Sequence, residues 1–316
     1  MATLVTGGAG FIGSHLCEAL LNKGTNVVCV DDFNDYYSPK FKNDNIRFLL
    51  KNKNFRLYKA DIANTKNLEP VFKKNKIEKI VHLAARAGVR ASIQHPLLYG
   101  NVNVLGTLNM LILSTQYKIK NFIFGSSSSV YGNAVKVPFS EKDETSKPIS
   151  PYAATKKAAE LICYTYSQLY NIPVTCLRLF TVYGPRGRPD MAPYKFTELI
   201  YNEKELPIFG DGTSKRDYTY VADIVNGIMN ALDNEFEFEI INLGNSNPVE
   251  LNKFVAIIEE NVGKKAKIKR LPIQPGEVKI TYSDIRKAKK LLDWEPKIKI
   301  NEGMNKFIDW YKNERA

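Results

Sequence analysis

The sequence predicts an α/β fold, in which a doubly wound parallel sheet is accompanied by a smaller C-terminal substrate-binding domain. Short apolar runs alternate with amphipathic stretches through the first part of the chain, a pattern typical of successive β and α units. The apolar runs are nearly continuous, as expected of parallel strands that are buried on both faces. After about Tyr183 the chain changes to shorter elements separated by loops that contain Gly and Pro.

The individual elements follow from these patterns. The predicted strands are Ala2–Thr6, Asn26–Val30, Phe55–Lys59, Lys79–Leu83, Asn121–Ser126 and Val174–Leu179. The predicted helices are Ile12–Asn22, Leu68–Asn75, Val102–Gln116 and Pro151–Tyr170. We expect the sheet domain to span residues 1–178 and to regain a strand near 219–245, at Ile240–Leu243. The smaller domain would take mainly residues 179–316 and would be interleaved with the first.

Composition restricts the classes of protein. The 316 residues are 44% hydrophobic and 25% charged, which is ordinary for a globular protein. A formal charge of +12 fits either a nucleic-acid binder or a basic cleft for an anionic small molecule. The lysines often occur in pairs, such as Lys73 with Lys74, and basic and aromatic residues are not interleaved as in RNA-binding proteins. The sequence therefore predicts no nucleic-acid partner.

Metal sites and membrane spans are also not indicated. The four cysteines form no C-x-x-C pair, and only three histidines are present. We therefore expect buried free thiols in a reducing compartment and no metal centre. The chain lacks a run of about 18 apolar residues and a secretory leader, which predicts a cytoplasmic protein without a membrane span.

A glycine-rich turn follows the first strand. Gly7, Gly10 and Gly13 have the spacing G-x-x-G-x-x-G, and the next helix begins near Phe11 and Ile12. The first glycine would permit the tight turn, the second the approach of a pyrophosphate, and the third close packing of helix on sheet. The helix N-terminus then points its free N–H groups at the phosphates. With a strand on each side, this pattern predicts a Rossmann-type dinucleotide site.

Acidic and small residues end the neighbouring strands. Asp31 ends the second strand, where a carboxylate accepts hydrogen bonds from the adenosine ribose and repels a 2′-phosphate. No Arg follows immediately to hold such a phosphate, so NAD is expected as the cofactor rather than NADP. Asp61-Ile62 would meet the adenine, and Leu83-Ala84-Ala85 would let the cofactor pass close to the backbone.

A tyrosine and a lysine indicate proton-transfer chemistry. Tyr152 and Lys156 are four residues apart at the start of a predicted helix, so their side chains share one face. A nearby ammonium and a positive nicotinamide ring would lower the phenol's pKa from about 10, which suits a base for a sugar hydroxyl. Upstream, Ser127-Ser128-Ser129 follow a strand end and face the same crevice.

Taken together, these motifs resemble the extended short-chain dehydrogenase/reductase family over nearly the whole chain. Within that family the chain looks most similar to nucleotide-sugar 4-epimerases, and above all to those acting on UDP-glucuronate. The matching segments include Asn34-Asp35-Tyr36-Tyr37, Asn103, Ala87-Gly88-Val89-Arg90, the stretch from Phe180 to Ala192, and Arg216-Asp217-Tyr218.

The resemblance implies a role for each matching residue. Ser127 and Tyr152 would handle the proton on O4, while Lys156 would bind the nicotinamide ribose. Asn103 would join the cofactor-binding residues. The substrate-binding residues would be Arg90, Ser128, Ser129, Thr181, Arg188 and Arg216, with Arg216 on the diphosphate. Family members are commonly homodimers through two helices, for which Val102–Gln116 and Pro151–Tyr170 are the candidates.

Three enzymatic alternatives stay open. Related 4,6-dehydratases carry Asp-Glu after the catalytic hydroxyl residue and related decarboxylases carry Ser-Glu, whereas this chain has Ser128 and Ser129. We therefore expect C4 epimerisation of UDP-glucuronate to UDP-galacturonate through a 4-keto intermediate. A UDP-glucose or UDP-N-acetylglucosamine 4-epimerase and a UDP-glucuronate decarboxylase are the rivals. Some UDP-hexose epimerases have an Arg in the region where this chain has Gln274. This difference argues against UDP-glucose as the main substrate.

Overall fold

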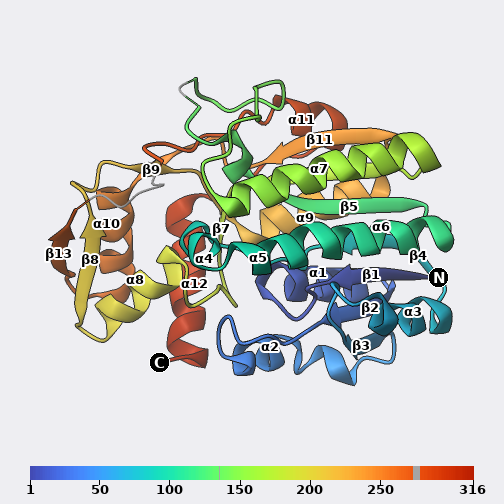
Figure 1. The fold of residues 1–316 in the computed structure, drawn as a ribbon. Coiled ribbons are helices and arrows are strands. Elements are labelled where there is room, and N and C mark those ends of the chain that lie inside the picture. The colour runs from blue at the N-terminus through green and yellow to red at the C-terminus, as the bar shows by residue number, and fades with distance from the viewer. Residues whose placement is uncertain (135, 273–277) are drawn as a thin grey trace.

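The computed structural model describes residues 1–134, 136–272 and 278–316, so Gln274 lies outside the described residues. A seven-stranded sheet forms its centre (Figure 1), and all neighbouring strands in it are parallel. From one edge to the other the strands are β11 (Phe238–Leu243), β6 (Val174–Leu179), β5 (Asn121–Ser127), β4 (Ile77–His82), β1 (Ala2–Thr6), β2 (Asn26–Asp31) and β3 (Phe55–Lys59). The predicted doubly wound parallel sheet is confirmed.

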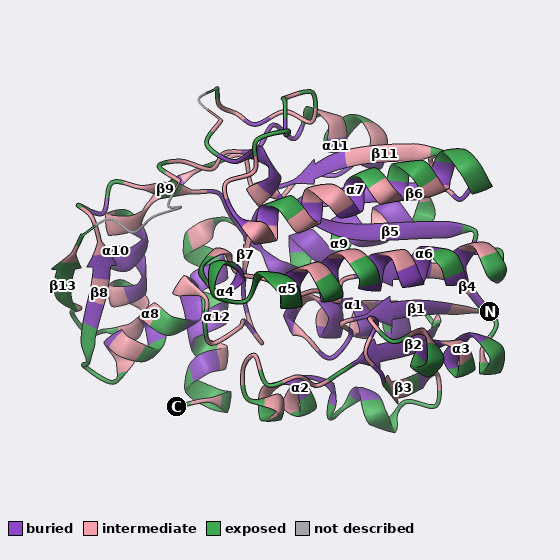
Figure 2. Ribbon diagram, viewed as in Figure 1, coloured by how far each residue is buried: buried purple, intermediate pink, exposed green. Residues whose placement is uncertain are grey.

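Helices cover both faces of this sheet. On one face α1 (Phe11–Asn22) packs against α9 (Val221–Asp233), and on the other α3 (Thr65–Lys74) and α7 (Pro151–Tyr170) flank α6 (Gly106–Gln116). Successive strand residues point to opposite faces, so Leu4 joins the apolar cluster of α3, α6 and α7 while Val5 joins that of α1 and α9. Both faces of the central strands are therefore buried (Figure 2).

The helix predicted at Val102–Gln116 begins earlier than expected. Helix α5 (Pro96–Tyr99) runs through a wide π-type turn at Gly100–Leu105 directly into α6. The continuous run Pro96–Gln116 has the length and apolar composition of a membrane-spanning helix, but 56% of its most apolar window is buried inside the protein. Packing against α7 accounts for part of that burial.

Most elements after β6 lie beyond the carboxyl ends of the central strands, whereas α9 and β11 belong to the sheet and its helical cover (Figure 1). Three small strand pairs occur there: β7 (Thr181–Tyr183) with β10 (Tyr218–Tyr220), β8 (Glu205–Phe209) with β13 (Lys267–Leu271), and β9 (Lys215–Arg216) with β12 (Val249–Glu250). Helix α10 (Leu251–Val262) packs against α8 (Ala192–Tyr201) and α12 (Ile300–Glu314), and α11 (Arg286–Leu292) lies on β11.

Three shorter segments lie near the sheet's carboxyl edge. Helix α2 (Pro39–Ile46) follows β2, and α4 (Val89–Gln94) follows β4. A 3₁₀ turn at Ser128–Tyr131 follows β5, and a second one at Leu49–Lys51 precedes β3. Together with the C-terminal elements, the segments after β2, β4 and β5 enclose the space at the end of the sheet.

Candidate active site

A cavity of about 430 Å³ lies at the carboxyl ends of β1, β2, β4, β5 and β6. Its walls come from the loops that follow these strands and from the first turns of α1 and α7. The chain reverses its strand order between β1 and β4, and open parallel sheets bind ligands at such a point. The fold thus brings the glycine turn, the strand-end acids and the tyrosine–lysine pair into one cavity.

The glycine turn has the geometry that its spacing predicts. Gly7 has a φ of +68°, and a Cβ there would lie 2.8 Å from the Ala84 backbone nitrogen. A Cβ on Gly13 would lie 2.2 Å from the Gly7 carbonyl oxygen, a distance that real side chains do not show. Only glycine therefore allows both the turn and the close seating of α1, whose N-terminus opens onto the cavity.

Lys156 on α7 is anchored to β5. Its Nζ donates to the carbonyl oxygen of Gly125 at 2.7 Å and lies 4.8 Å from the centre of the Phe124 ring. Burial lowers the pKa of Lys156 to about 8. Its ammonium is fixed by β5, one helical turn from Tyr152.

Burial has the largest effect on the pKa of the Tyr152 phenol in the chain by itself. Burial raises the pKa of this phenol, whereas the Ser127 hydrogen bond and the charge of Arg188 lower it by less. The predicted acidification requires a nicotinamide ring as well as Lys156, whose ammonium donates to the Gly125 carbonyl. Desolvation outweighs the favourable groups because a phenolate loses more hydration than a phenol does.

The serine run forms a second polar wall. Ser127 ends β5, and its Oγ donates to Ser129 Oγ at 3.1 Å and accepts from the Ser129 backbone N–H at 3.2 Å. All three serines, Ser127 to Ser129, line the cavity together with Thr181 from β7. The hydroxyl groups therefore gather on the side of the cavity nearest Tyr152.

Arg188 supplies a cation to the same cavity. Its Nε and Nη2 donate to the two oxygens of Asp190 at 3.0 and 2.6 Å, and its guanidinium lies 5.1 Å from the centre of the Tyr36 ring. Burial alone would lower the pKa of Arg188, but Asp190 outweighs burial and raises it. Arg188 therefore stays charged while it lines the cavity.

The described residues match a family model for GDP-mannose 4,6 dehydratase over residues 4–307. The UDP-glucuronate 4-epimerase of Thermodesulfobacterium geofontis is 46% identical over 98% of this chain and 95% of its own length. The chain belongs to this family of extended short-chain dehydrogenases/reductases. A crystal structure of UDP-glucuronic acid 4-epimerase from Bacillus cereus, in complex with UDP-glucuronic acid and NAD, has a TM-score of 0.93 at 38% identity and covers 99% of each chain.

A second similar solved structure contains a different sugar nucleotide, UDP-glucose. It is the UDP-glucose 4-epimerase of Thermotoga maritima with UDP-glucose, with a TM-score of 0.92, 33% identity and coverage of 100% of each chain. Solved structures with this fold thus contain either a neutral or an acidic sugar nucleotide. The choice of substrate must therefore come from individual side chains.

Three predicted site residues do not line the cavity. Asn103, in the π-type turn, receives the Arg86 N–H at 2.8 Å, donates to the Arg86 carbonyl at 3.0 Å and to Thr155 Oγ1 at 3.1 Å. The Arg90 guanidinium lies 4.6 Å from the Phe209 ring centre, and Arg216 Nη1 donates to the Lys215 carbonyl at 2.9 Å. The other predicted site residues all lie on the cavity wall.

Several cavity residues were not predicted from the sequence. Tyr36, Tyr37 and Arg86 line the wall, as do Lys42 from α2 and Met191 before α8. The Asn34–Tyr37 motif marked the first two by resemblance, but no role was assigned to it. The sequence did not indicate a role for Lys42. Its helix is short, and the path of the loop between Asp31 and this helix cannot be predicted from the sequence.

A buried ion pair holds the elements of the site together. Arg178 on β6 donates from Nε and Nη2 to the two oxygens of Glu160 on α7, both at 2.9 Å, and Ser126 Oγ donates to Glu160 Oε1 at 2.6 Å. All three residues are buried. Glu160 is one turn after Lys156, and Ser126 precedes Ser127, so the pair joins α7, β5 and β6 directly behind the cavity.

Proposed function

We propose that this chain is an NAD-dependent epimerase that inverts C4 of UDP-glucuronate to give UDP-galacturonate. The observation that carries the proposal is the presence of Ser127, Tyr152, Lys156 and Arg188 on one cavity wall beside the glycine turn. The described similarity to UDP-glucuronate 4-epimerases supports it. Serines at 128 and 129, in place of a carboxylate, favour a reaction without elimination.

The cavity fits a dinucleotide on its own geometry. The turn leaves no room for side chains at Gly7 and Gly13, and the α1 N-terminus faces the space where phosphates would lie. The residues that would hold NAD are Gly7, Gly10, Phe11, Ile12, Gly13, Asp31, Asp61, Ile62, Leu83, Ala84, Ala85, Tyr152 and Lys156. Asn103 would contribute by fixing the Arg86 backbone. NAD, when bound, supplies the hydride acceptor and donor for C4.

The chain's own residues then carry the proton chemistry. Tyr152 removes the O4 proton. The Ser127 hydroxyl, which lowers the pKa of the phenol, would turn from Ser129 Oγ to donate to the phenol oxygen, orient it and stabilise its negative charge. Lys156, one helical turn after Tyr152, supplies a positive charge whose position is held by the Gly125 carbonyl. Inversion requires the 4-keto sugar to turn within the cavity, so that C4 would receive hydride back on its opposite face. Tyr152 then gives the proton back to O4.

Substrate binding divides between two parts of the chain. Residues 1–178 would form the NAD-binding domain, with a return near 219–245, and residues 179–316 would form most of the UDP-sugar domain. Ser128, Ser129, Thr181 and Arg188 would hold the sugar and its carboxylate, because hydroxyls and a guanidinium satisfy carboxylate oxygens. Neither Arg216 nor Arg90 lines the cavity wall. Arg216, from the second part, would reach the diphosphate, and Arg90, from the first part, would lie near the sugar carboxylate.

The decisive assay offers purified protein UDP-glucuronate and UDP-glucose separately and identifies products by NMR. We expect UDP-galacturonate from the first and slower turnover of the second. Arg188→Ala should lower kcat/KM for UDP-glucuronate at least about tenfold, the effect of one charge-assisted hydrogen bond, and change turnover of UDP-glucose much less. The neutral sugar is the internal control.

Two results would contradict this proposal. Faster wild-type turnover of UDP-glucose, with Arg188→Ala affecting both sugars equally, would favour a hexose epimerase. Release of carbon dioxide with formation of a UDP-pentose would favour a decarboxylase.

We also propose that the protein forms a homodimer through α5–α6 and α7. These helices lie side by side on one face (Figure 2) and expose large apolar side chains at Leu97, Leu105, Ile112, Leu161, Tyr164 and Leu169. An apolar stripe at helical spacing on two adjacent helices is typical of a helix-packing interface. The expected assembly is a four-helix contact between two copies.

Light scattering after size exclusion tests the dimer. The wild type should run as a dimer at micromolar concentration, and Leu105→Glu combined with Leu161→Glu should run as a monomer, because two buried carboxylates would face an apolar partner. Ile268→Glu, at an equally exposed apolar residue on β13, should leave the dimer intact. A monomeric wild type, or loss of the dimer in the Ile268 variant, would contradict the proposed interface.

A cytoplasmic location is proposed as well. It is supported by the four free cysteines, all buried, and by a nucleotide-sugar substrate.

A further inference from the structure

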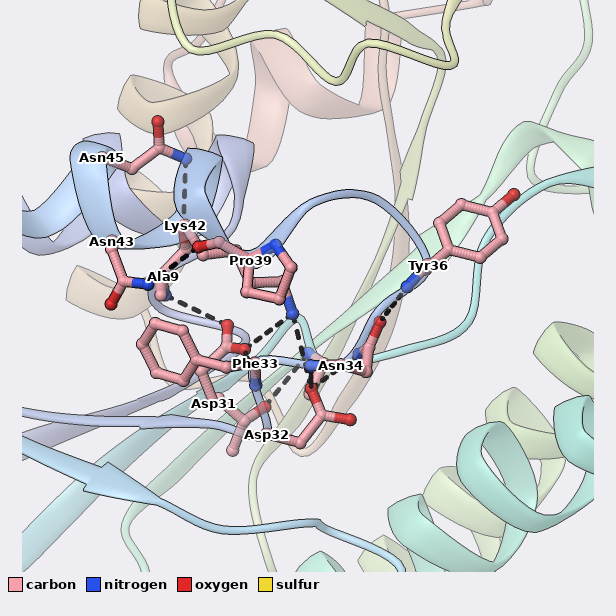
Figure 3. A network of polar contacts seen from close by, with 12 residues as sticks. Ala9, Asp31, Asp32, Phe33, Asn34, Tyr36, Pro39, Lys42, Asn43 and Asn45 are labelled. Atoms are coloured by element: carbon pink, nitrogen blue, oxygen red, sulfur yellow. Dashed lines mark hydrogen bonds and ion pairs between the residues drawn. The ribbon is translucent and has the colours of Figure 1, made fainter.

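Lys42 forms an ion pair with Asp31, the residue that ends β2 (Figure 3). Lys42 on α2 places its Nζ 2.8 Å from Asp31 Oδ1 and 3.4 Å from Asp32 Oδ1. The exposed fraction of the Lys42 side chain is 8% and that of Asp31 is 3%. All three residues line the cavity. A nearly buried ammonium therefore occupies the position where the adenosine ribose is recognised.

The structure fixes this ammonium from two sides. Asn45, three residues on, donates its side-chain amide to the Ala9 carbonyl in the glycine turn at 3.1 Å. At the other side of α2, Asp44 pairs with Arg315 at 2.7 Å and Arg47 with Glu314 at 2.9 Å. Helix α2 is thus held between the glycine turn and the end of α12, and Lys42 is not a mobile surface side chain.

The hydrogen bonds at Asp31 show what the pair can bind. Oδ1 accepts from the Phe33 N–H at 2.9 Å and from Lys42, whereas Oδ2 accepts from the Ala9 N–H at 3.2 Å. A carboxylate oxygen accepts two hydrogen bonds, so Oδ2 has capacity for a ribose hydroxyl. An ammonium has three donors, and two are directed at Asp31 and Asp32, which leaves one for a ligand oxygen.

The charges of the cluster determine which ribose it accepts. Two carboxylates and one ammonium leave a local excess of negative charge, which disfavours a 2′-phosphate. The ammonium alone would attract that phosphate, as lysines do at many phosphate sites. The acids therefore have two effects: they repel a 2′-phosphate, and they engage two of the three donors of the Lys42 ammonium beside them.

We propose that Lys42 and Asp31 together determine the preference for NAD over NADP. In this pair the Asp31 carboxylate binds the Lys42 ammonium, which is then not available to bind a 2′-phosphate. The inference rests on the proposed dinucleotide-dependent function. It differs from a choice made by the acid alone, because removal of the Asp31 charge would then only weaken the rejection of NADP. Under the proposed pairing, removal of the Asp31 charge also releases the Lys42 ammonium, which then gains affinity for the 2′-phosphate of NADP.

Direct binding of reduced dinucleotides tests this pairing without any sugar substrate. Protein freed of bound nucleotide is titrated with NADH and with NADPH, and binding is followed by nicotinamide fluorescence. The wild type should prefer NADH. In Asp31→Asn the ratio of NADPH to NADH affinity should rise at least about tenfold, as expected for one new charge-assisted contact. Asn keeps the shape of the side chain and can still accept the Phe33 N–H.

The role of Lys42 is isolated by a second substitution. Asp31→Asn combined with Lys42→Met should lose the gain in NADPH affinity, whereas Asp31→Asn combined with Lys59→Met should keep it. Lys59 is the matched control, since it is the register partner of Asp31 on β3 but is exposed and outside the cavity wall. Lys42→Met alone should weaken NADH binding and should not improve NADPH binding.

Each outcome decides the inference. No rise in the NADPH ratio for Asp31→Asn, or a rise that survives Lys42→Met, would overturn it. If Asp31→Asn does not fold, as judged by its melting curve, unchanged NADH affinity in Lys42→Met overturns the proposal and weakened affinity supports it. A wild type that binds neither NADH nor NADPH would overturn both this inference and the proposed function. Wild-type binding of NADH without C4 epimerisation would overturn only the proposed function.

Discussion

Tyr152→Phe should reduce kcat for C4 epimerisation by at least about a thousandfold, while the KM for UDP-glucuronate changes by less than about threefold. Removal of a general base typically costs 10² to 10⁴ in rate, and here the same oxygen serves both proton transfers. The half-buried Tyr152 lines the cavity with Ser127 and Arg188, and Phe leaves no oxygen at that position to take the proton. Steady-state rates with product identified by NMR measure the effect.

A neighbouring tyrosine provides the control for this variant. Tyr99 packs edge-on against Tyr152 with ring centres 6.2 Å apart, and its hydroxyl donates to the Ala87 carbonyl at 2.9 Å. Tyr99→Phe removes an equivalent hydroxyl outside the cavity wall and should keep kcat within a few-fold. If Tyr152→Phe retains wild-type activity, the proton-transfer role assigned to Tyr152 is wrong.

The pH dependence of kcat follows from the same groups. Burial raises the pKa of Tyr152, and the Ser127 hydrogen bond opposes that rise. Ser127→Ala should therefore raise the phenol's pKa further and lower kcat throughout the pH range below that pKa. Lys156, whose pKa burial lowers to about 8, loses its charge above that value while the phenolate fraction is still growing, so the rise of kcat with pH should level off above about 8.

The sequence was sufficient to predict the elements that carry the chemistry. Near-continuous apolar runs predicted the strands, because a parallel strand that is buried on both faces carries apolar residues at successive positions. Parallel strands place their carboxyl ends on one edge, so Gly7, Asp31, Ser127 and Tyr152 had to approach one another. Local spacing and one topological rule therefore predicted most of the cavity wall.

The sequence was insufficient where a contact depends on the path of a loop. Lys42 reaches Asp31 only because α2 is held by Ala9 and by Arg315, residues far apart in the chain. The direction of Lys156 is set by the Gly125 carbonyl, which no spacing rule predicts. The effect of burial on the pKa of Tyr152 was not predicted either, since solvent exclusion depends on the whole fold.

The Glu160–Arg178 pair should have the largest effect on stability. Glu160→Gln leaves the buried Arg178 charge without its bidentate partner, and breaking one side of a buried pair typically costs about 3–5 kcal/mol of the free energy of unfolding. Urea unfolding followed by circular dichroism measures this loss. Glu69→Gln, which breaks the exposed Lys73 pair on α3, should cost less than about 1 kcal/mol.

A double variant separates the loss of the pair from the stranded charge. Glu160→Gln combined with Arg178→Met removes both charges, and it should regain most of the stability lost by Glu160→Gln, because replacing a whole buried pair is often nearly neutral. It should nevertheless lower kcat, since Ser126 and α7 lose the group that ties them together. Wild-type kcat in the double variant would show that the pair stabilises the fold without positioning Ser127 and Tyr152.

The same pair predicts the direction of acid sensitivity. Burial alone would raise the pKa of Glu160, but hydrogen bonds from Arg178 and Ser126 and the Arg178 charge outweigh it and lower the pKa below 4.5. The folded chain then binds the proton less readily than the unfolded chain, so the stabilisation is present above about pH 4.5 and is lost as the pH falls through the lowered value. The double variant lacks this carboxylate and should lose less stability on acidification than the wild type, and an equal loss would place the sensitivity elsewhere.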